Sequence, residues 1–247
     1  MKILVTGAAG FVGSHVLKRL KELGQDVYGI DNFSSYYSVD YKNLRLEYLG
    51  LTRGSDVITC DISDYEQVSE LISRIKPDYI IHLAAQALVR ESYRSPEETI
   101  ETNVMGTINV LKASQQLTDL KAQLIITTDK VYKNIGKTSG YVETEALGGQ
   151  DPYSASKAMA DIATQSWLSS FENPTTAIAR AGNVIGGGDV CADRLIPDLI
   201  RSYSSRLTPK LRAPNSVRPW QHVLDCLNGY LMLVDAVIQN DADGAWN

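Results

Sequence analysis

The sequence is poor in cysteine and histidine, with three of each among 247 residues. Cys60, Cys191 and Cys226 form no C-x-x-C pair and no disulfide-framework spacing, so we expect free thiols and a reducing, cytoplasmic location. The histidines are scattered as well. The spacing typical of zinc ligands is therefore missing, and we predict no metal site.

Long apolar runs and an excess of positive charge are also missing. No stretch is long enough to cross a bilayer, and the first residues, MKILV, have no signal-peptide layout. The 24 Lys and Arg residues face 29 Asp and Glu, a net charge of -5. We therefore expect no membrane partner and no nucleic-acid partner. The hydrophobic content of 44% is enough for one large core.

Short β-rich runs alternate with helical patterns over most of the chain. This alternation predicts an α/β fold, a Rossmann doubly wound parallel sheet with helices on both faces. The expected strands are 2–6, 26–30, 56–60, 79–83, 124–128 and 175–181, and the expected helices are 11–23, 65–75, 96–114, 153–171 and 224–238.

From about residue 183 the pattern changes, because glycine, proline and arginine become frequent and the elements shorten. We therefore expect two domains. Residues 1–182 would form a dinucleotide-binding Rossmann domain, and residues 183–247 would form a small substrate-binding lobe.

Gly7, Gly10 and Gly13 lie between the first expected strand and the first expected helix. Glycines there let the backbone approach a pyrophosphate, and the helix N-terminus, with Phe11 and Val12 in its first turn, offers free N–H groups. A plain tight turn is the alternative, but the strand and helix on either side favour a dinucleotide site.

Asp31 ends the second expected strand and is followed by Asn32. A carboxylate there accepts hydrogen bonds from the ribose of an adenosine and repels a 2′-phosphate, so the sequence favours NAD over NADP. The alternative is a loop or capping aspartate. Two further segments at strand ends belong to the predicted cofactor site by position: Asp61 and Ile62, and the run Leu83, Ala84, Ala85 and Gln86.

Tyr153 and Lys157 form a Y-x-x-x-K pair at the start of a helix, where a spacing of four places both on one face. We expect the ammonium to lower the pKa of the phenol, so that Tyr153 removes a proton from a sugar hydroxyl. Thr128 closes the fifth expected strand and would bond the same hydroxyl. Both residues of the pair would also contact the cofactor. A surface tyrosine and lysine on an amphipathic helix is the alternative.

Together these motifs resemble extended short-chain dehydrogenases/reductases that act on nucleotide sugars. The middle and C-terminal segments are most similar to the CDP-glucose 4,6-dehydratase branch of that family. The segments that carry this similarity are TDKVYKN (128–134), LGGQDPYSASK (147–157), ARAGNVIGGGD (179–189), DRLIPD (193–198) and VRPWQHVL (217–224).

The resemblance implies an NAD-dependent reaction on a nucleotide sugar, with CDP-glucose as the expected substrate. The sugar would be oxidised at C4, water would be lost across C5 and C6, and hydride would return to C6. By the same resemblance Asp129 is the acid for the departing hydroxyl and Lys130 the base at C5. Asn183, Arg194 and Arg218 would hold the nucleotide part of the substrate.

The first third of the chain, with GAAGFVG at 7–13 and DNFSSYY at 31–37, is more similar to UDP-sugar 4-epimerases. A nucleotide-sugar 4-epimerase is therefore an alternative. A truncated, non-catalytic NAD-binding protein is another, because the terminal GAWN resembles the first residues of a strand and family members continue further. We accordingly expect an incomplete lobe, with NAD binding but poor turnover.

Family members commonly pair their long helices into a dimer. Here that interface would use the helices at 96–114 and 153–171, with Val104, Ile108 and Leu111 as an apolar stripe. The same stripe suits packing against the sheet. The resemblance therefore predicts a homodimer.

Overall fold

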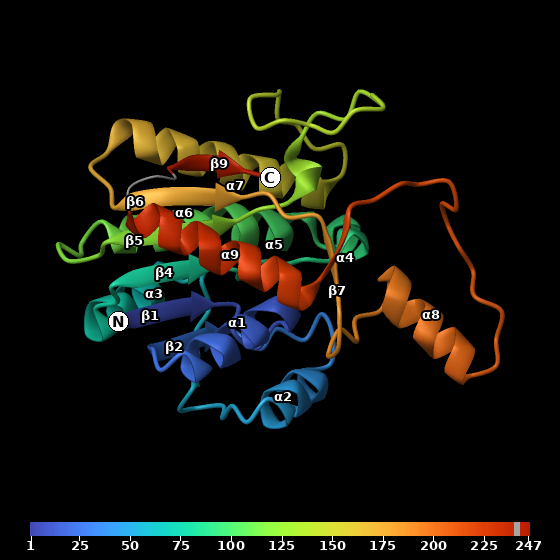
Figure 1. Ribbon diagram of the computed structural model, residues 1–247, viewed down its shortest axis with the longest axis horizontal. Helices are drawn as coiled ribbons and strands as arrows, with labels where there is room; N and C mark the ends of the chain where they lie inside the picture. The colour runs from blue at the N-terminus through green and yellow to red at the C-terminus, as the bar shows by residue number, and fades with distance from the viewer. Residues whose placement is uncertain (240–242) are drawn as a thin grey trace.

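The computed structural model describes residues 1–239 and 243–247, and in them seven strands form one parallel sheet (Figure 1). The strand order is β3-β2-β1-β4-β5-β6-β9, so the direction of winding reverses between β1 and β4. This is the predicted doubly wound sheet. The strands are β1 (Lys2–Thr6), β2 (Asp26–Asp31), β3 (Val57–Thr59), β4 (Tyr79–His82), β5 (Ala122–Ile126), β6 (Thr175–Ala179) and β9 (Gly244–Trp246).

Helices cover both faces of the sheet. On one face α1 (Phe11–Glu22) packs beside α9 (Val223–Ile238), and α9 crosses β5 and β6 (Figure 1). On the other face lie α3 (Tyr65–Ile75), α6 (Gly106–Ser114) and α7 (Pro152–Ser170). Each face has its own apolar core, because buried parallel strands carry apolar side chains on both sides.

Helix α3 shows how local sequence sets these elements. Val68, Leu71 and Ile72 follow helical spacing and are buried against the sheet. Asp64 caps the helix by accepting from the backbone N–H of Gln67, and Lys76 ends it in the left-handed conformation. The predicted bounds of this helix are those observed.

The segment 96–114, predicted as one helix, contains α5 (Pro96–Ile100), a π-helical turn at Glu101–Met105, and α6. Ser95 occupies the N-cap position, but its side chain makes no capping hydrogen bond. The π-helical turn contains Asn103, which is 1% exposed and hydrogen-bonds to the Gln86 backbone and to Ser156. Two further helices, α2 (Val39–Tyr48) and α4 (Val89–Arg94), both lie near the carboxyl ends of the strands (Figure 1).

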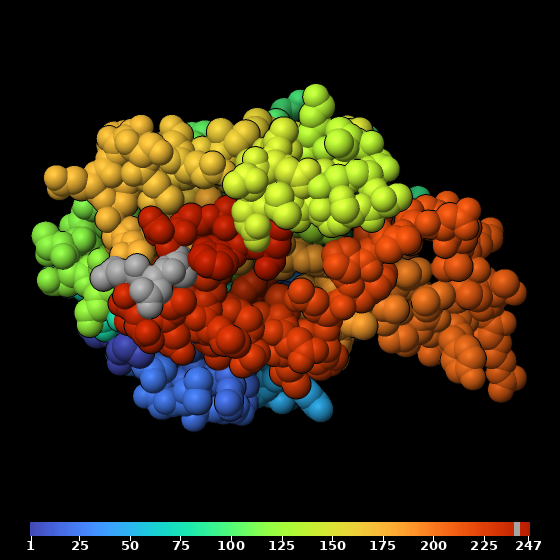
Figure 2. Space-filling view, turned by 45° about the horizontal axis from the view of Figure 1, so that its top comes forward, coloured from blue at the N-terminus to red at the C-terminus, as the bar shows by residue number. Residues whose placement is uncertain are grey.

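The range 183–247 does not form one separate lobe in space. The strands β7 (Asn183–Ile185) and β8 (Trp220–His222) pair with each other, and α8 (Leu195–Ser204) projects from the body (Figures 1 and 2). Helix α9 and strand β9, however, belong to the layers of the main sheet. Of the described residues in the range 183–247, only the segment 183–222 therefore lies outside the layers of the main sheet. Within the described residues, no helix combines the length and apolar character needed to cross a membrane.

Candidate functional site

The glycine segment after β1 is closely packed on itself. Gly7 adopts φ +70°, and the Gly10 N–H donates to the Gly7 carbonyl at 2.9 Å. A Cβ on Gly13 would lie 2.1 Å from that same carbonyl oxygen, and one on Gly7 would lie 2.8 Å from the Ala84 backbone. Only glycine fits these positions. Helix α1 begins here with no side-chain cap, which leaves its first N–H groups for a ligand.

A cavity of about 970 Å³ opens beside this segment, at the carboxyl ends of the strands where the winding reverses. Open α/β sheets bind ligands at this place. Most of the residues predicted from the sequence line the cavity: Gly7, Gly10, Phe11, Val12, Gly13, Asp31, Asn32, Ile62, Leu83, Ala84, Ala85, Gln86, Thr128, Lys130, Tyr153, Lys157, Asn183, Arg194 and Arg218.

Two predicted site residues, Asp61 and Asp129, are absent from the cavity lining. Asp61 instead accepts hydrogen bonds from Asn32 and from the backbone and hydroxyl of Ser63. Burial would raise the pKa of Asp61, but these hydrogen bonds outweigh it and the pKa is lowered. Asp61 thus orients Asn32, which does line the cavity.

Asp31 is buried at the end of β2 and holds several donors. Its Oδ2 accepts from the Ala9 N–H at 3.1 Å, and its Oδ1 accepts from the Phe33 N–H at 2.8 Å. The Lys42 ammonium lies 3.2 Å from Oδ1. The sequence reading missed Lys42, because a lysine on a short helix gives no signal that it reaches a distant carboxylate.

Tyr153 and Lys157 come from the first turns of α7. Tyr153 is hydrogen-bonded to Thr128, two residues beyond β5, whereas the Lys157 Nζ donates to the Ile126 carbonyl at 2.7 Å. Burial raises the pKa of Tyr153 to about 12, although Arg194 and Thr128 act in the opposite direction. Burial lowers the pKa of Lys157 to about 8. The predicted lowering of the Tyr153 pKa is therefore wrong for this structure, because desolvation of the phenol dominates.

The pair that follows β5 is already joined in an ion pair. The Lys130 Nζ donates to Asp129 Oδ1 at 2.9 Å and to Asn183 Oδ1 at 3.0 Å. The Thr128 hydroxyl also donates to Asp129 Oδ1, at 3.0 Å. The predicted acid and base are thus in contact with each other. Asp129 also contacts Thr128, which was predicted to bond the sugar hydroxyl, and Lys130 contacts Asn183, which was predicted to hold the substrate.

A buried hydrogen-bond chain supports the site from beneath. The Leu83 and Ala84 N–H groups donate to the Thr6 hydroxyl, so the Thr6 proton is directed to His82 Nδ1 at 2.8 Å. His82 therefore carries its proton on Nε2 and donates to Thr107 at 3.1 Å. Burial and the nearby charge of Lys157 lower the pKa of His82 to about 3, so His82 is neutral.

The chain continues to the helix that holds Tyr153. Thr107 donates to the Asn103 carbonyl, and the Asn103 side chain donates to the Ser156 hydroxyl at 2.8 Å. Ser156 in turn donates to the Tyr153 carbonyl. Sequence patterning cannot find such a chain, because its members come from separate strands and helices.

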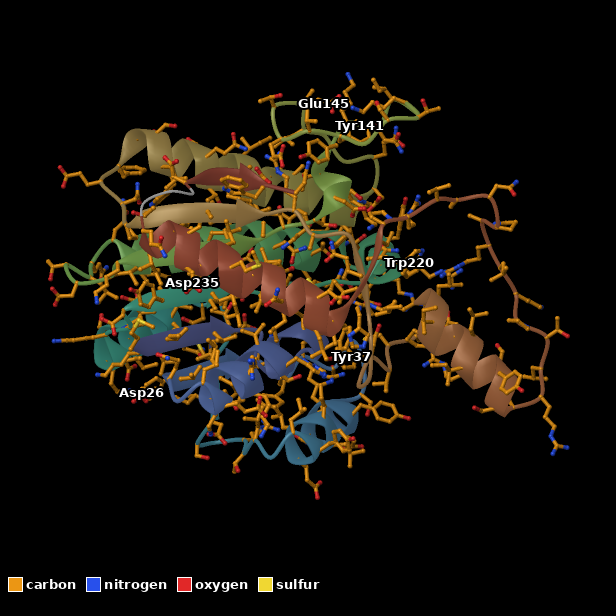
Figure 3. The ribbon with its side chains drawn as sticks, in the orientation of Figure 1. Asp26, Tyr37, Tyr141, Glu145, Trp220 and Asp235 are labelled. Carbon is orange, nitrogen blue, oxygen red and sulfur yellow. The ribbon has the colours of Figure 1, made fainter. Side chains whose placement is uncertain are left out.

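A second missed residue, Arg45 on α2, joins the glycine segment to the region before α8. Its Nη1 donates to the Ala9 carbonyl at 2.7 Å, and its Nη2 donates to the Gly188 carbonyl at 2.7 Å. Tyr37 lies under it and is also hydrogen-bonded to it. In Figure 3, Tyr37 and Trp220 lie at the end of the sheet that faces α8.

The predicted substrate arginines differ in their surroundings. Arg194 occupies the N-cap position of α8, lies 3.4 Å from Asp189 and is close enough to Tyr153 to influence its pKa. Arg218 is exposed and donates to the adjacent Val217 carbonyl at 2.7 Å. Arg194 is therefore placed near the reacting end of the cavity, whereas Arg218 lies at its surface.

A parallel sheet, a glycine cradle, a ribose-position aspartate and a Tyr-x-x-x-Lys pair define a dinucleotide-dependent enzyme class. The chain belongs to the NAD dependent epimerase/dehydratase family, whose model matches residues 3–247.

Among curated proteins, the chain is 40% identical over its full length to a CDP-glucose 4,6-dehydratase from Salmonella typhimurium and covers 70% of it. It is 30% identical over 95% of its length to a probable dTDP-glucose 4,6-dehydratase from Sinorhizobium fredii, of which it covers 68%. It spans only 52% of a probable UDP-glucuronate 4-epimerase from Rhizobium meliloti.

Two solved structures are close to the fold. A UDP-glucuronic acid 4-epimerase from Bacillus cereus, in complex with UDP-glucuronic acid and NAD, matches with a TM-score of 0.88 at 27% identity, covering the whole chain and 77% of that protein. A dTDP-glucose 4,6-dehydratase from Streptomyces venezuelae, solved with NAD bound, matches with a TM-score of 0.85 at 25% identity, covering the whole chain and 74% of that protein.

Proposed function

We propose that this protein is an NAD-dependent nucleotide-sugar 4,6-dehydratase and that its substrate is CDP-glucose. The observation that carries the proposal is the Asp129–Lys130 pair, joined at 2.9 Å and hydrogen-bonded to Thr128 beside Tyr153. This pair supplies the acid and the base that a dehydration needs in addition to hydride transfer. The identity of 40% to the Salmonella enzyme supports the choice of nucleotide and sugar.

The glycine segment fits the cofactor, because the absence of side chains at Gly7 and Gly13 lets the segment fold tightly on itself before α1, whose uncapped N-terminus would face a pyrophosphate. Asp31 would accept from the adenosine ribose, and Lys157 would reach the other ribose from α7. When bound, NAD accepts the C4 hydride of the sugar and later returns it to C6.

Tyr153, ionised to its phenolate, is the base for the first step. It takes the proton of the sugar 4-hydroxyl as the C4–H bond breaks and a ketone forms. Thr128 is hydrogen-bonded to Tyr153 and orients this transfer. Because burial raises the pKa of Tyr153 to about 12 even with Arg194 nearby, the phenolate also needs the positive charges of Lys157 and of the bound oxidised cofactor.

The ketone acidifies the C5 proton, and Lys130 removes it while Asp129 protonates the departing C6 hydroxyl, which leaves as water. Both roles require the proton of the pair to sit on Asp129 and not on Lys130. The ion pair and the neutral pair of carboxylic acid and amine hold the same number of protons. Transfer of one proton from Lys130 to Asp129 along their 2.9 Å hydrogen bond therefore prepares the site. Elimination then regenerates the ion pair, and Lys130 returns a proton to C5 as hydride reaches C6. The pair is then one proton short and Tyr153 holds the proton of the sugar 4-hydroxyl, so transfer of that proton through Thr128 to Asp129 restores the starting state.

A nucleotide-sugar 4-epimerase is the second candidate. The observation that favours it is the TM-score of 0.88 to the Bacillus cereus 4-epimerase. Epimerisation uses the tyrosine, the lysine and the cofactor, but it has no step for Asp129 and Lys130. The two functions therefore differ in the mass of the product, because an epimer keeps the mass of its substrate.

The experiment is incubation of the purified protein with NAD and the CDP, UDP, GDP and dTDP forms of glucose, followed by mass spectrometry. We expect loss of one water from CDP-glucose. Lys130→Met should stop this loss while NADH absorbance accumulates, and the exposed Lys133→Met is the matched control that should leave turnover intact. An epimer of unchanged mass, or no conversion of any sugar, overturns the dehydratase assignment.

We also propose that the protein is a homodimer. The support is a group of exposed apolar side chains on α5, the π-helical turn and α7: Ile100, Met105, Met159 and Ile162 are 41%, 42%, 38% and 51% exposed. Leu111, part of the stripe expected from the sequence, is buried, so we propose that the dimer interface uses the exposed group instead.

We propose a cytoplasmic location as well, which the free, buried Cys60, Cys191 and Cys226 support.

A further inference from the structure

The adenosine end of the cavity contains a buried ion pair that the reaction itself does not use. Lys42 and Asp31 have side chains only 3% and 7% exposed, with 3.2 Å between Nζ and Oδ1. The rings of Tyr36 and Tyr37 lie 5.4 and 5.1 Å from the ammonium. All four residues line the cavity. A lysine so deeply buried must be paired, and its partner here is the residue expected to bind the ribose.

Both Asp31 and Lys42 can make further hydrogen bonds to a ligand. An ionised carboxylate has about four acceptor sites. Asp31 accepts from Ala9, Phe33 and Lys42, which leaves one site for a ribose hydroxyl. The ammonium has three donors, of which Asp31 takes one. The pair thus presents an acceptor and donors side by side, which matches a ribose diol because each hydroxyl can donate and accept.

The pair also changes the electrostatic argument about cofactor choice. An unpaired Asp31 would repel a 2′-phosphate through its charge. With Lys42 at 3.2 Å, the local net charge is close to zero, so repulsion by the carboxylate is largely cancelled. Rejection of a 2′-phosphate must then depend on the ammonium being occupied by Asp31.

We propose that Lys42 is a specificity-determining residue of the dinucleotide site. Paired with Asp31 it favours the free ribose of NAD, and without that carboxylate it becomes the cation that binds a 2′-phosphate. This inference rests on the proposed NAD-dependent function and extends it, because it assigns cofactor choice to the pair and not to Asp31 alone.

The test is fluorescence titration with NADH and NADPH of the wild type, Asp31→Ala, Lys42→Met and the double variant. We expect the wild type to bind NADH at least tenfold more tightly than NADPH. Asp31→Ala should bind NADPH at least tenfold more tightly than the wild type does, because a lysine–phosphate contact replaces the internal ion pair. In the double variant this gain should disappear. Lys42→Met alone should weaken NADPH binding further, because the carboxylate is then unpaired.

Two control variants distinguish a specific effect of the pair from a general change in charge and from misfolding. Lys18→Met removes a half-buried lysine of α1 that pairs with Glu22, away from the cavity, and should leave both affinities unchanged. Asp31→Asn keeps an acceptor for the backbone donors, so it reports the same gain if Asp31→Ala fails to fold. If Asp31→Ala raises the affinity for NADPH equally in the presence of Lys42 and in the Lys42→Met background, this inference is overturned and the proposed function is not. A wild type that binds neither cofactor overturns the proposed function as well.

Discussion

Replacing His82 with glutamine should remove a large part of the acid sensitivity of this protein. His82 is 2% exposed and lies between Thr6 and Thr107, with its pKa lowered to about 3 by burial and by Lys157. An unfolded histidine has a pKa near 6.5. As the pH falls below that value, the unfolded chain gains a proton that the folded protein does not bind. Stability is therefore lost on acidification.

The magnitude follows from the two pKa values. Between pH 7.5 and pH 5 the loss from His82 amounts to about 2 kcal/mol, and it continues at about 1.4 kcal/mol per pH unit until the folded pKa near 3 is reached. His82→Gln also disturbs the Thr6–Thr107 hydrogen bonds. That cost is independent of pH, so it shifts the curve without changing the slope contributed by residue 82.

The assay is urea unfolding at several pH values between 5 and 7.5, for the wild type, His82→Gln and the exposed His222→Gln as control. We expect the stability difference between the wild type and His82→Gln to shrink by about 2 kcal/mol across this range. Because the His222 ring accepts from the Leu224 N–H at the start of α9, the control should lie below the wild type by a nearly constant amount across this range. A difference that stays constant with pH would refute the claim that His82 is held neutral by the fold.

Three further predictions concern the site and the surface. Tyr153→Phe should lower the rate of sugar oxidation at least a hundredfold and leave NADH binding largely intact, because only the hydroxyl moves a proton. Stopped-flow measurement of NADH formation tests the rate, and fluorescence titration with NADH tests the binding. Gly13→Ala should weaken NADH binding at least tenfold with an unchanged circular-dichroism spectrum, because the new Cβ would lie 2.1 Å from the Gly7 carbonyl oxygen. Ile162→Asp should give a monomeric mass by light scattering, whereas Leu44→Asp, exposed on α2, should not; a monomeric wild type would contradict the proposed dimer.

The sequence was sufficient for features that depend on local pattern. Helix α3 was predicted to the residue, because the spacing of its apolar residues is a local signal. The glycine segment was predicted because its strand and helix context is contiguous in sequence. The strand expected at the end of the chain is β9, which pairs with β6.

The sequence was insufficient wherever distant segments decide the outcome. The π-helical turn contains Asn103, which bonds to Gln86 and Ser156, and no periodicity signals those contacts. Lys42 meets Asp31 only through the path of the β2–α2 loop. The pKa of Tyr153 depends on how far its phenol is removed from solvent, which a spacing of four residues does not report.

Arg45 places a fixed positive charge beside the glycine segment. It is buried and held by the Ala9 and Gly188 carbonyls, and no carboxylate forms an ion pair with it within residues 1–239 and 243–247. Mobile ions screen exposed charges efficiently but reach a buried guanidinium poorly. The attraction between this guanidinium and a pyrophosphate at the neighbouring glycine segment should therefore persist in concentrated salt, so that the protein retains its dinucleotide at ionic strengths that would strip an anion from a surface cluster of lysines.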